Sequence, residues 1–409
     1  MTQVPNDPAT PIHDPDHQPN YATVEMPADT AKDDTASVAS TVDQAAHKPL
    51  IPPSSERSVL VNTLLLLCLI AYGMFEGASF QRSGVFLPVS ITGQMVFKLW
   101  IVLKMFMSAV GASMVCQGLL NLAMQHEFDR SRVYKKKRAG FLRVIAGSAT
   151  LGVGMALGGS GPTMLPSQIG GGVSTAWVTL LGALAGGVVF SIIDKFAPSI
   201  FANPEGDEMM TLDTKVVNFR YELLSVPIGF VLVGVCVGLE FALPQSDDEK
   251  AIGLGPLPWY PTAAGAIVGV GQVPMRLIAG HGQGGSTSLM TVIGTLTCGV
   301  LAPAHRLVSF QQAWQFAFVW VGTTLGSLAS SQINNFPYPE GVSYWRAAVG
   351  GFLMLFGARV AGGCTCGHGV SGFAELSLES AVAAICIFGF GIATGFVIEA
   401  AGGTMCCSA

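Results

Sequence analysis

The sequence predicts an all-α membrane protein that crosses the lipid bilayer about nine times. Half of the 409 residues are hydrophobic, 11% are charged and 50 are glycine, whereas soluble domains carry about 25% charged residues. Apolar stretches of about 20 residues, enough to span the bilayer as helices, recur along the chain. These stretches are residues 59–78, 99–124, 140–157, 175–193, 223–243, 261–280, 313–333, 344–361 and 380–401. We therefore expect a multi-pass protein in contact with lipid, and we place it in the plasma membrane.

The first 57 residues are expected to form a disordered cytoplasmic tail. They are rich in Pro, Asp, Thr and Ala and hold few large apolar residues, so they cannot bury enough surface to offset the entropy of ordering. They also lack the basic and apolar regions of a secretory signal peptide. Beyond the tail we expect a first transmembrane repeat (58–193), a connector with one helix (194–260), a second repeat (261–401) and a short end (402–409).

Four shorter stretches rich in Gly, Ser and Thr alternate with the long ones. They cover residues 84–97, 160–172, 284–300 and 364–377, and their length fits re-entrant segments better than full spans. Residues 143–160 also align with residues 346–364, and each copy is followed by a Gly/Ser stretch and then an apolar stretch. The alternative is that small-residue helices resemble one another in all membrane proteins.

The basic loop at residues 130–138 sets the expected orientation, because Lys- and Arg-rich loops stay cytoplasmic. Two helices precede this loop, so the N-terminus is cytoplasmic and, after nine helices, the C-terminus lies outside. The two repeats are then inverted, with re-entrant segments that meet at the midplane. Many secondary transporters build their binding site in this way.

The run GARVAGGCTCGHGVSG, residues 357–372, carries the chemistry. Glycine-rich, non-helical backbone at membrane depth is tolerated only inside protein or along a cavity, so this run predicts a pore or binding site. The short stretches offer hydroxyls, thiols and an imidazole, and free N–H groups at helix starts favour an anion. The candidate pore residues are Cys364, Thr365, Cys366, His368, Ser371, Ser160, Thr163, Ser286, Thr287, Ser288 and Gln94, with His281 and Gln283 beside them.

Charged residues inside apolar stretches are costly and usually functional. Lys104 and Arg359 lie well inside the second stretch and directly before the cysteine run, so both are candidates for steering an anion. Lys98, Arg276 and Arg346 lie near predicted helix ends, and we expect them to reach the membrane interface.

We expect no metal and no cofactor. A zinc site needs wider ligand spacing and a fourth ligand, whereas Cys364, Cys366 and His368 alternate with single residues. The cysteines that are scattered singly through apolar stretches are expected to pack as small hydrophobic residues.

Three motifs resemble those of the YeeE/YedE sulfur-transport family: residues 83–95, the run 284–288 and the run 359–372. The likeness extends over most of residues 59–401. It implies uptake of thiosulfate or a related sulfur anion, with pore cysteines that bind the substrate through S–H hydrogen bonds rather than covalently. Cys364 matches the second cysteine of the family, whereas Ser160 stands where members usually carry the first.

These observations predict a permease, and not an enzyme, for a small sulfur-containing anion. No P-loop for nucleotide hydrolysis is present in the sequence, and no nucleic-acid partner is expected. One alternative is a membrane thiol oxidoreductase that relays electrons through Cys364 and Cys366, although such relays favour Cys-x-x-Cys pairs. Another is a lipid-anchored protein, because residues 406–409 fit a prenylation box, but the expected topology places them outside the cell.

Uptake of a dianion into a negative-inside cell is opposed by roughly 4.6 kcal/mol at 100 mV. The sequence therefore predicts one of two driving forces. Either a cytosolic sulfurtransferase consumes the anion, or uptake is coupled to protons. His368 is the candidate proton carrier, because it alone in the cysteine run titrates near neutral pH.

Overall fold

Helices make up the fold, and the only β-pairing among the described residues is a single bridge between Thr211 and Ser377. The computed structural model describes residues 51, 56–125, 128–129, 140–201, 211–242, 258–308, 310–336 and 339–405. They belong to one compact unit, Lys48–Ala409. Nearly all of the expected tail, the basic loop at 130–138 and the C-terminal cysteines at 406–407 lie outside the described residues.

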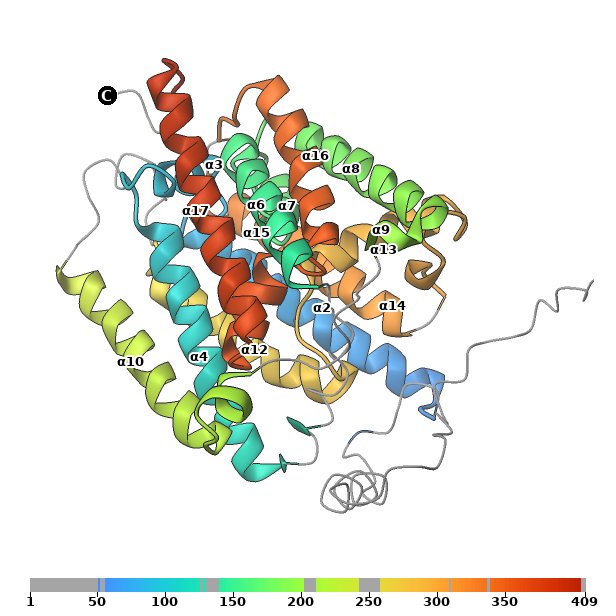
Figure 1. Ribbon diagram of the computed structural model, residues 1–409, viewed down its shortest axis with the longest axis vertical. Coiled ribbons are helices and arrows are strands. Elements are labelled where there is room, and N and C mark those ends of the chain that lie inside the picture. The colour runs from blue at the N-terminus through green and yellow to red at the C-terminus, as the bar shows by residue number, and fades with distance from the viewer. Residues whose placement is uncertain are drawn as a thin grey trace, which may run out of the picture. The chain divides into compact units, whose positions relative to one another are not determined.

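Seven described helices are long and apolar enough to cross a membrane (Figure 1). They are α2 (Val59–Arg82), α4 (Ile101–Ala123), α6 (Phe141–Gly158), α8 (Ala176–Phe196), α10 (Tyr221–Ala242), α12 (Pro261–Ala279) and α17 (Leu378–Ala400). An eighth crossing results if α16 (Tyr344–Val360) is counted with the π-helix η4 (Thr365–Gly372), which follows it at a bend of 50°. The predicted all-α, multi-pass membrane architecture is thereby confirmed.

The described helices give seven or eight crossings, fewer than the nine or so predicted. One of the predicted crossings, 344–361, depends on whether α16 is counted with η4. Another is lost in the predicted stretch 313–333, which the structure divides into α14 (Phe310–Gln315), the π-helix η3 (Phe316–Gly322) and α15 (Thr323–Ile333). Here α2 approaches closely: a Cβ added to Gly73 would lie 2.3 Å from the carbonyl oxygen of Phe318. The wider π-helical turns leave no single α-helix of spanning length.

Each of the four predicted short stretches contains one short helix. These are α3 (Pro88–Gln94), α7 (Met164–Gly170), α13 (Gly285–Leu296) and η4. The chain can turn from a long helix into a short one because glycine adopts positive φ there, as at Gly159 after α6 (φ 56°) and Gly280 after α12 (φ 81°). Three small elements lie outside this plan: α9 (Pro198–Phe201), the π-helix η1 (Leu212–Val216) and the 3₁₀ turn η2 (Pro303–His305).

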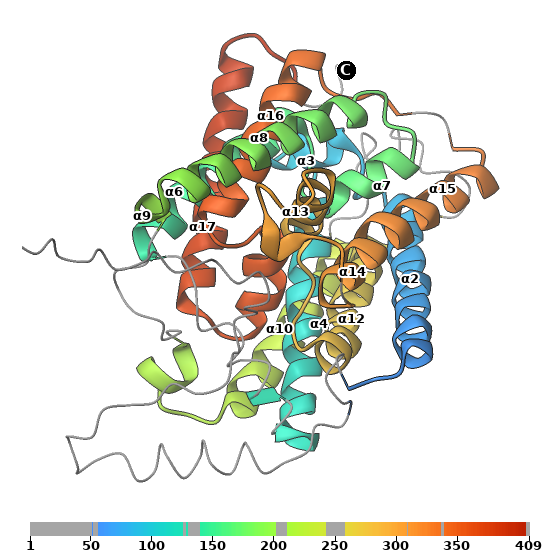
Figure 2. The ribbon, with the colours of Figure 1, turned by 90° about the vertical axis from the view of Figure 1, so that its right-hand side faces the viewer.

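The long helices pack in close pairs (Figures 1 and 2). In one group, α16 lies between α6 and α8, and α6 also contacts α17. In another, α4 lies between α10 and α12. The helix α2 packs along η3 and α15. Small residues allow this approach. A Cβ added to Gly154 of α6, for example, would lie 2.4 Å from the backbone nitrogen of Met354 in α16.

The main buried cluster surrounds the short helices rather than the ends of the long ones. It includes Val85 and Ile91 from the first short segment, Leu165 from α7, Leu289 from α13 and Cys364 from the start of η4. The long helices thus enclose the glycine- and hydroxyl-rich segments.

Candidate functional site

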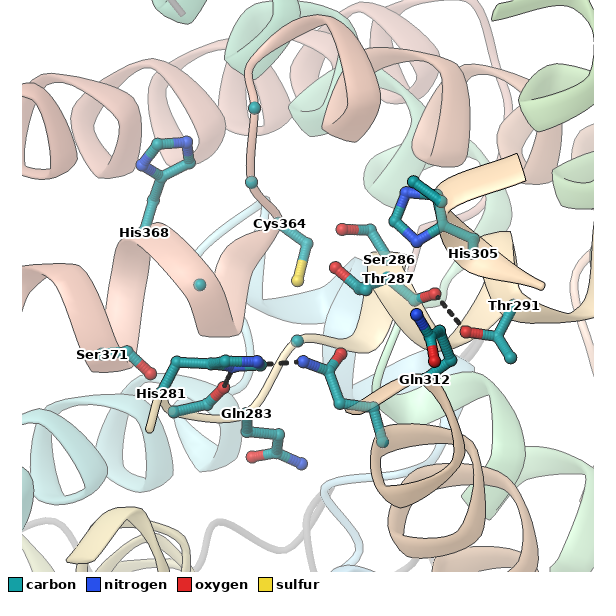
Figure 3. Close-up of a pocket in the computed structure, with 17 residues that line it drawn as sticks. His281, Gln283, Ser286, Thr287, Thr291, His305, Gln312, Cys364, His368 and Ser371 are labelled. Atoms are coloured by element: carbon teal, nitrogen blue, oxygen red, sulfur yellow. Dashed lines mark hydrogen bonds between the residues drawn. The ribbon is translucent and has the colours of Figure 1, made fainter. Parts of the chain in front are cut away.

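A polar cavity of about 330 Å³ lies where the loop before α13 faces the turn after α16 (Figure 3). None of the described residues that line it carries a carboxylate. Its polar lining consists of His281, Gln283, Ser286, Thr287, Thr291, His305, Gln312, Gln315, Cys364, His368 and Ser371. The cavity thus brings together five of the predicted pore residues, from two short helices that lie far apart in the sequence.

Cys364 forms one wall of this polar pocket. The turn Gly362-Gly363 ends α16, and Cys364 then caps η4 in an extended conformation with no side-chain hydrogen bond to the helix. The thiol is 1% exposed, and its sulfur points into the pocket (Figure 3). Gly363 is needed in the turn, because an added Cβ would lie 2.7 Å from the His368 ring.

The start of α13 forms the opposite wall. Gly284 caps this helix, again without a side-chain hydrogen bond, and the Ser286 and Thr287 hydroxyls follow in its first turn. Two uncapped helix starts therefore face one cavity, and helix starts attract negative charge through their free N–H groups. The pocket suits an anion without using a fixed counter-ion in its lining.

Arg359 supplies positive charge behind the pocket wall. It lies in the last turn of α16, where its Nη2 is 3.5 Å from His305 Nε2 and its guanidinium is 5.7 Å from the centre of the Phe190 ring. Burial and the Arg359 charge lower the pKa of His305 from 6.5 to about 3. His305 is therefore uncharged at neutral pH, and Arg359 is the cation of this wall.

His368 lines the pocket, but its ring is engaged elsewhere. Nε2 lies 3.0 Å from the carbonyl oxygen of Ala361, and Nδ1 lies 3.3 Å from the Ser380 hydroxyl. The ring is directed toward the turn before Cys364 rather than toward the Cys364 sulfur (Figure 3). These contacts fit a neutral imidazole that donates to Ala361 and accepts from Ser380.

A second, apolar chamber of about 50 Å³ lies on the other side of η4. Thr365, Cys366 and Thr163 line it, together with apolar side chains such as Met155 and Phe388. The Cys366 sulfur lies 2.9 Å from the Thr163 hydroxyl, and the Thr365 hydroxyl donates to the Met155 sulfur at 3.2 Å. Cys364 and Cys366 are both free thiols, and they face different cavities.

The other predicted residues lie outside both linings. Ser160 is fully buried between α6 and α7, and its hydroxyl has no hydrogen-bond partner among the described residues. The Ser288 hydroxyl bonds within α13 to Gly285 at 2.6 Å, and Gln94 accepts from the backbone nitrogen of Leu103 at 2.9 Å. Lys104 pairs at 3.3 Å with Glu240 of α10, where it balances a buried carboxylate.

Two of the three cations expected at the interface are buried instead. Arg276 forms an ion pair with Glu375 in which both side chains are almost fully buried. Arg346 donates to the carbonyl oxygens of Thr404 and Ala156 and is 9% exposed. The expectation was wrong for Arg276, because Glu375 replaces water as its partner. Arg346 also has internal partners but lines a hollow at the start of α16, and Lys98 is half exposed in its ion pair with Glu399.

Sequence reasoning missed several residues of the polar pocket, namely Thr291, His305, Gln312 and Gln315. Gln312 and Gln315 are three residues apart at the start of an apolar stretch, and that spacing places them on one helix face. Glu76 was missed as well, although an acid within an apolar stretch is as strong a sign of function as a base there. It contacts Gln283 of the pocket.

The sequence profile of the family described as sulphur transport matches residues 82–394, about three quarters of the chain. The chain belongs to the sulphur-transport family. Membership confirms the predicted resemblance and makes the protein an integral membrane transporter, as the sequence predicted, rather than an enzyme.

Curated relatives of this sulphur-transport protein include two probable transporters from Xylella fastidiosa, of strains 9a5c and Temecula1 / ATCC 700964. Each is 33% identical to the chain over 138 residues, which cover 33% of this chain and 91% of the relative. Both relatives are therefore much shorter than the chain.

Proposed function

We propose that this protein is a permease for a sulfur-containing anion, with thiosulfate as the leading substrate, and that the anion binds in the polar pocket against Cys364. One observation carries the proposal: the Cys364 thiol points into a cavity lined by two uncapped helix starts, hydroxyls and amides, without a carboxylate among the described lining residues.

The chemistry of the pocket suits a large, polarizable anion. Hydroxyl, amide and backbone N–H groups can donate to its oxygens, and the Cys364 S–H is a weak, soft donor for a terminal sulfur. Arg359 adds positive charge from behind the wall. Weak individual contacts favour passage, because a conducting site must release its ion as well as bind it.

The proposed route continues past η4 through the chamber of Cys366 and Thr163 to the buried hydroxyl of Ser160. A second hollow, of about 800 Å³, lies at the other end of α16, where Pro88, Val342 and Arg346 line it. Gly159 reaches toward this hollow, since a Cβ added there would lie 2.9 Å from Pro88 Cβ. Hollows at the two ends of α16 support a path with two mouths.

In the expected orientation the polar pocket opens toward the cytoplasm. Arg57, which precedes the first long helix, lies 5.3 Å from the ring centre of Phe310 at the start of α14, and α14 contributes Gln312 and Gln315 to the pocket. α14 thus links the pocket lining to the end of α2 that follows the N-terminal tail. Ser160 and the second hollow would then lie toward the outside.

The helix pairs support an inverted repeat. In this repeat, α2, α4, α6 and α8 of the first half correspond, in that order, to α12, α14–α15, α16 and α17 of the second half. The contact of α2 with α15 then corresponds to the contact of α12 with α4. The contact of α6 with α17 likewise corresponds to the contact of α16 with α8. The contact between α6 and α16 joins two corresponding helices, so it is its own counterpart. The short relatives fit a transporter assembled from two such units.

Uptake of labelled thiosulfate into proteoliposomes tests this function, with sulfate and sulfite as competitors. We expect saturable uptake that thiosulfate analogues inhibit more strongly than sulfate, and its loss in Cys364→Ala. Cys386→Ala, which removes a partly buried thiol from α17 away from both cavities, is the matched control. Equal inhibition by sulfate, or full activity of Cys364→Ala, would contradict the proposal. A purified sulfurtransferase trapped inside the vesicles tests whether consumption of the anion sustains uptake.

A further inference from the structure

Glu76 is a buried acid directly behind the polar pocket. It lies in the last third of α2, six residues before its end, and is 0% exposed. Its Oε1 accepts a hydrogen bond from Gln283 Nε2 at 2.7 Å, whereas its Oε2 is buried without a partner among the described residues. A buried carboxylate with an unsatisfied oxygen is costly in an apolar environment, so its presence in a membrane helix calls for a functional reason.

Gln283 connects this acid to the proposed substrate site. Its side chain forms part of the pocket lining, and its backbone nitrogen donates to Gln272 Oε1 at 3.3 Å. The same Gln272 oxygen accepts from the Ser371 hydroxyl at 2.8 Å, and Ser371 lines the pocket too. Gln283 Oε1 and Gln272 Nε2 are buried without partners in the described part of the chain. Both amides therefore have unused hydrogen-bonding capacity next to the acid.

No cation neutralises Glu76 within the described residues. Tyr72, one turn earlier in α2, and the Cys366 thiol of η4 are its titratable neighbours. α12 also packs against α2, but its one charged side chain, Arg276, is bound to Glu375. Among the other described elements that pack closely against α2, namely α7, α14, η3 and α15, none carries an ionisable side chain. In the loop before α13, His281 is bound to Gln315.

His368, the proton carrier that the sequence suggested, is a weaker candidate. Both of its ring nitrogens already have partners, Ala361 and Ser380. A proton added at Nδ1 would have to displace the Ser380 donor interaction in a buried site. Glu76, by contrast, has one oxygen without a partner among the described residues and an amide partner that can both donate and accept.

We propose that Glu76 binds a proton together with the anion, so that the protein works as a proton–anion symporter; this inference rests on the proposed function. When Glu76 is ionised, it holds the Gln283 N–H₂ group. When it is protonated, its O–H donates to Gln283 Oε1, the amide turns over, and the N–H₂ group becomes a donor for the anion in the pocket wall. The negative charge of an anion in the pocket favours protonation of Glu76. The proton and the anion therefore bind and leave together.

The test uses the full-length protein in proteoliposomes with the membrane potential held at zero. An acidic exterior should accelerate thiosulfate uptake and raise its accumulation by about tenfold per pH unit if one proton accompanies each anion. A pH dye inside the vesicles should record acidification that depends on thiosulfate.

Glu76→Gln should exchange labelled thiosulfate at equal pH without any response to the gradient, whereas Glu76→Asp keeps a carboxyl and should keep the response. Glu399→Gln, in the partly exposed pair with Lys98, is the charge-matched control and should behave as the wild type.

Infrared difference spectra on addition of thiosulfate give a second readout that does not require transport. We expect a carbonyl band of a protonated carboxylic acid in the wild type, its loss in Glu76→Gln and its displacement in Glu76→Asp. Uptake that ignores the pH gradient, proton movement that persists in Glu76→Gln, or a band unchanged in Glu76→Asp overturns the proposal. The thiosulfate-induced band without uptake of any sulfur anion would instead contradict the permease function and retain Glu76 as the proton site.

Discussion

The Thr163 hydroxyl lies 2.9 Å from the Cys366 sulfur, although 203 residues separate the two in the sequence. Thr163 caps α7, and Cys366 lies in the first turn of η4. Gly285, at the start of α13, packs on the same threonine, because a Cβ there would lie 2.6 Å from Thr163 Cγ2. The starts of the three short helices α7, α13 and η4 thus lie next to one another. The contact also occupies Cys366 and leaves Cys364 as the thiol that is open to a ligand.

Arg359 is predicted to contribute to anion affinity without touching the anion. Arg359→Gln should raise the KM for thiosulfate by about tenfold, about 1.4 kcal/mol, because it removes the cation of this wall while His305 stays neutral. Initial uptake rates over a range of thiosulfate concentrations measure this change. Arg306→Gln, at an exposed cation next to His305, is the control and should leave KM unchanged. An unaltered KM in Arg359→Gln would show that its charge does not reach the pocket.

Gly282→Ala is predicted to damage the pocket floor. An added Cβ would lie 2.4 Å from Gln272 Oε1 and 2.5 Å from the Ser371 hydroxyl, and those two groups are hydrogen-bonded to each other. Overpacking of this kind costs about 1–3 kcal/mol, so we expect a lower melting temperature and a large loss of uptake. Gly234→Ala in α10 meets no atom within 4 Å and should change neither. A normal melting temperature with normal uptake in Gly282→Ala would mean that the floor can rearrange.

Sequence patterns predicted the fold better than the site. Apolar length located the long helices, because lipid requires continuous hydrophobic surface, and glycine-rich breaks located the short ones. The π-helical turns of η3 were not visible, since apolar composition alone does not distinguish a π-helix from an α-helix.

At the site, the cysteine run and the hydroxyl run led to the pocket, because both supply polar groups on short helices. The roles of Lys104 and His368 depend on partners far along the chain, Glu240 for the lysine and Ser380 with Ala361 for the histidine. No spacing rule reveals such partners. Glu76 could have been found, since an acid within an apolar helix is visible in the sequence itself.

His305 predicts a specific loss of stability in acid. Its pKa is about 3 in the folded protein and 6.5 as the ordinary value. Below about 6.5 the unfolded chain therefore binds a proton that the folded protein does not, and the contribution of His305 to stability falls progressively as the pH drops toward 3. The melting temperature of the detergent-solubilised protein between about pH 7 and pH 4 measures the effect. His305→Gln, which cannot titrate, should lose less stability over this interval; parallel curves for the two proteins would rule the assignment out.

Substitutions of the two thiols separate a permease from a thiol relay. In a permease, Cys364→Ala abolishes uptake, because the soft donor is gone from the pocket wall, whereas Cys364→Ser retains part of it, because serine keeps a donor in place. Folding should survive either change, since the loss of one sulfur is small beside a large core truncation. In a relay, Cys364→Ser and Cys366→Ser would be as inactive as alanine, because a hydroxyl cannot form a disulfide. The separate cavities of the two thiols favour the first outcome.

Ser160→Cys completes the series. The Ser160 hydroxyl is buried without a partner among the described residues, so a thiol there loses no hydrogen bond. It also restores the residue that the family resemblance implies at this position, and we expect uptake to be retained or to rise. Ser191→Cys is the matched control, because that hydroxyl is likewise buried but bonds within α8 to the carbonyl oxygen of Gly187 at 2.8 Å, and it lines neither cavity. Uptake of thiosulfate, measured at equal surface expression, decides the point: a Ser160→Cys protein that folds but no longer transports would remove Ser160 from the proposed route.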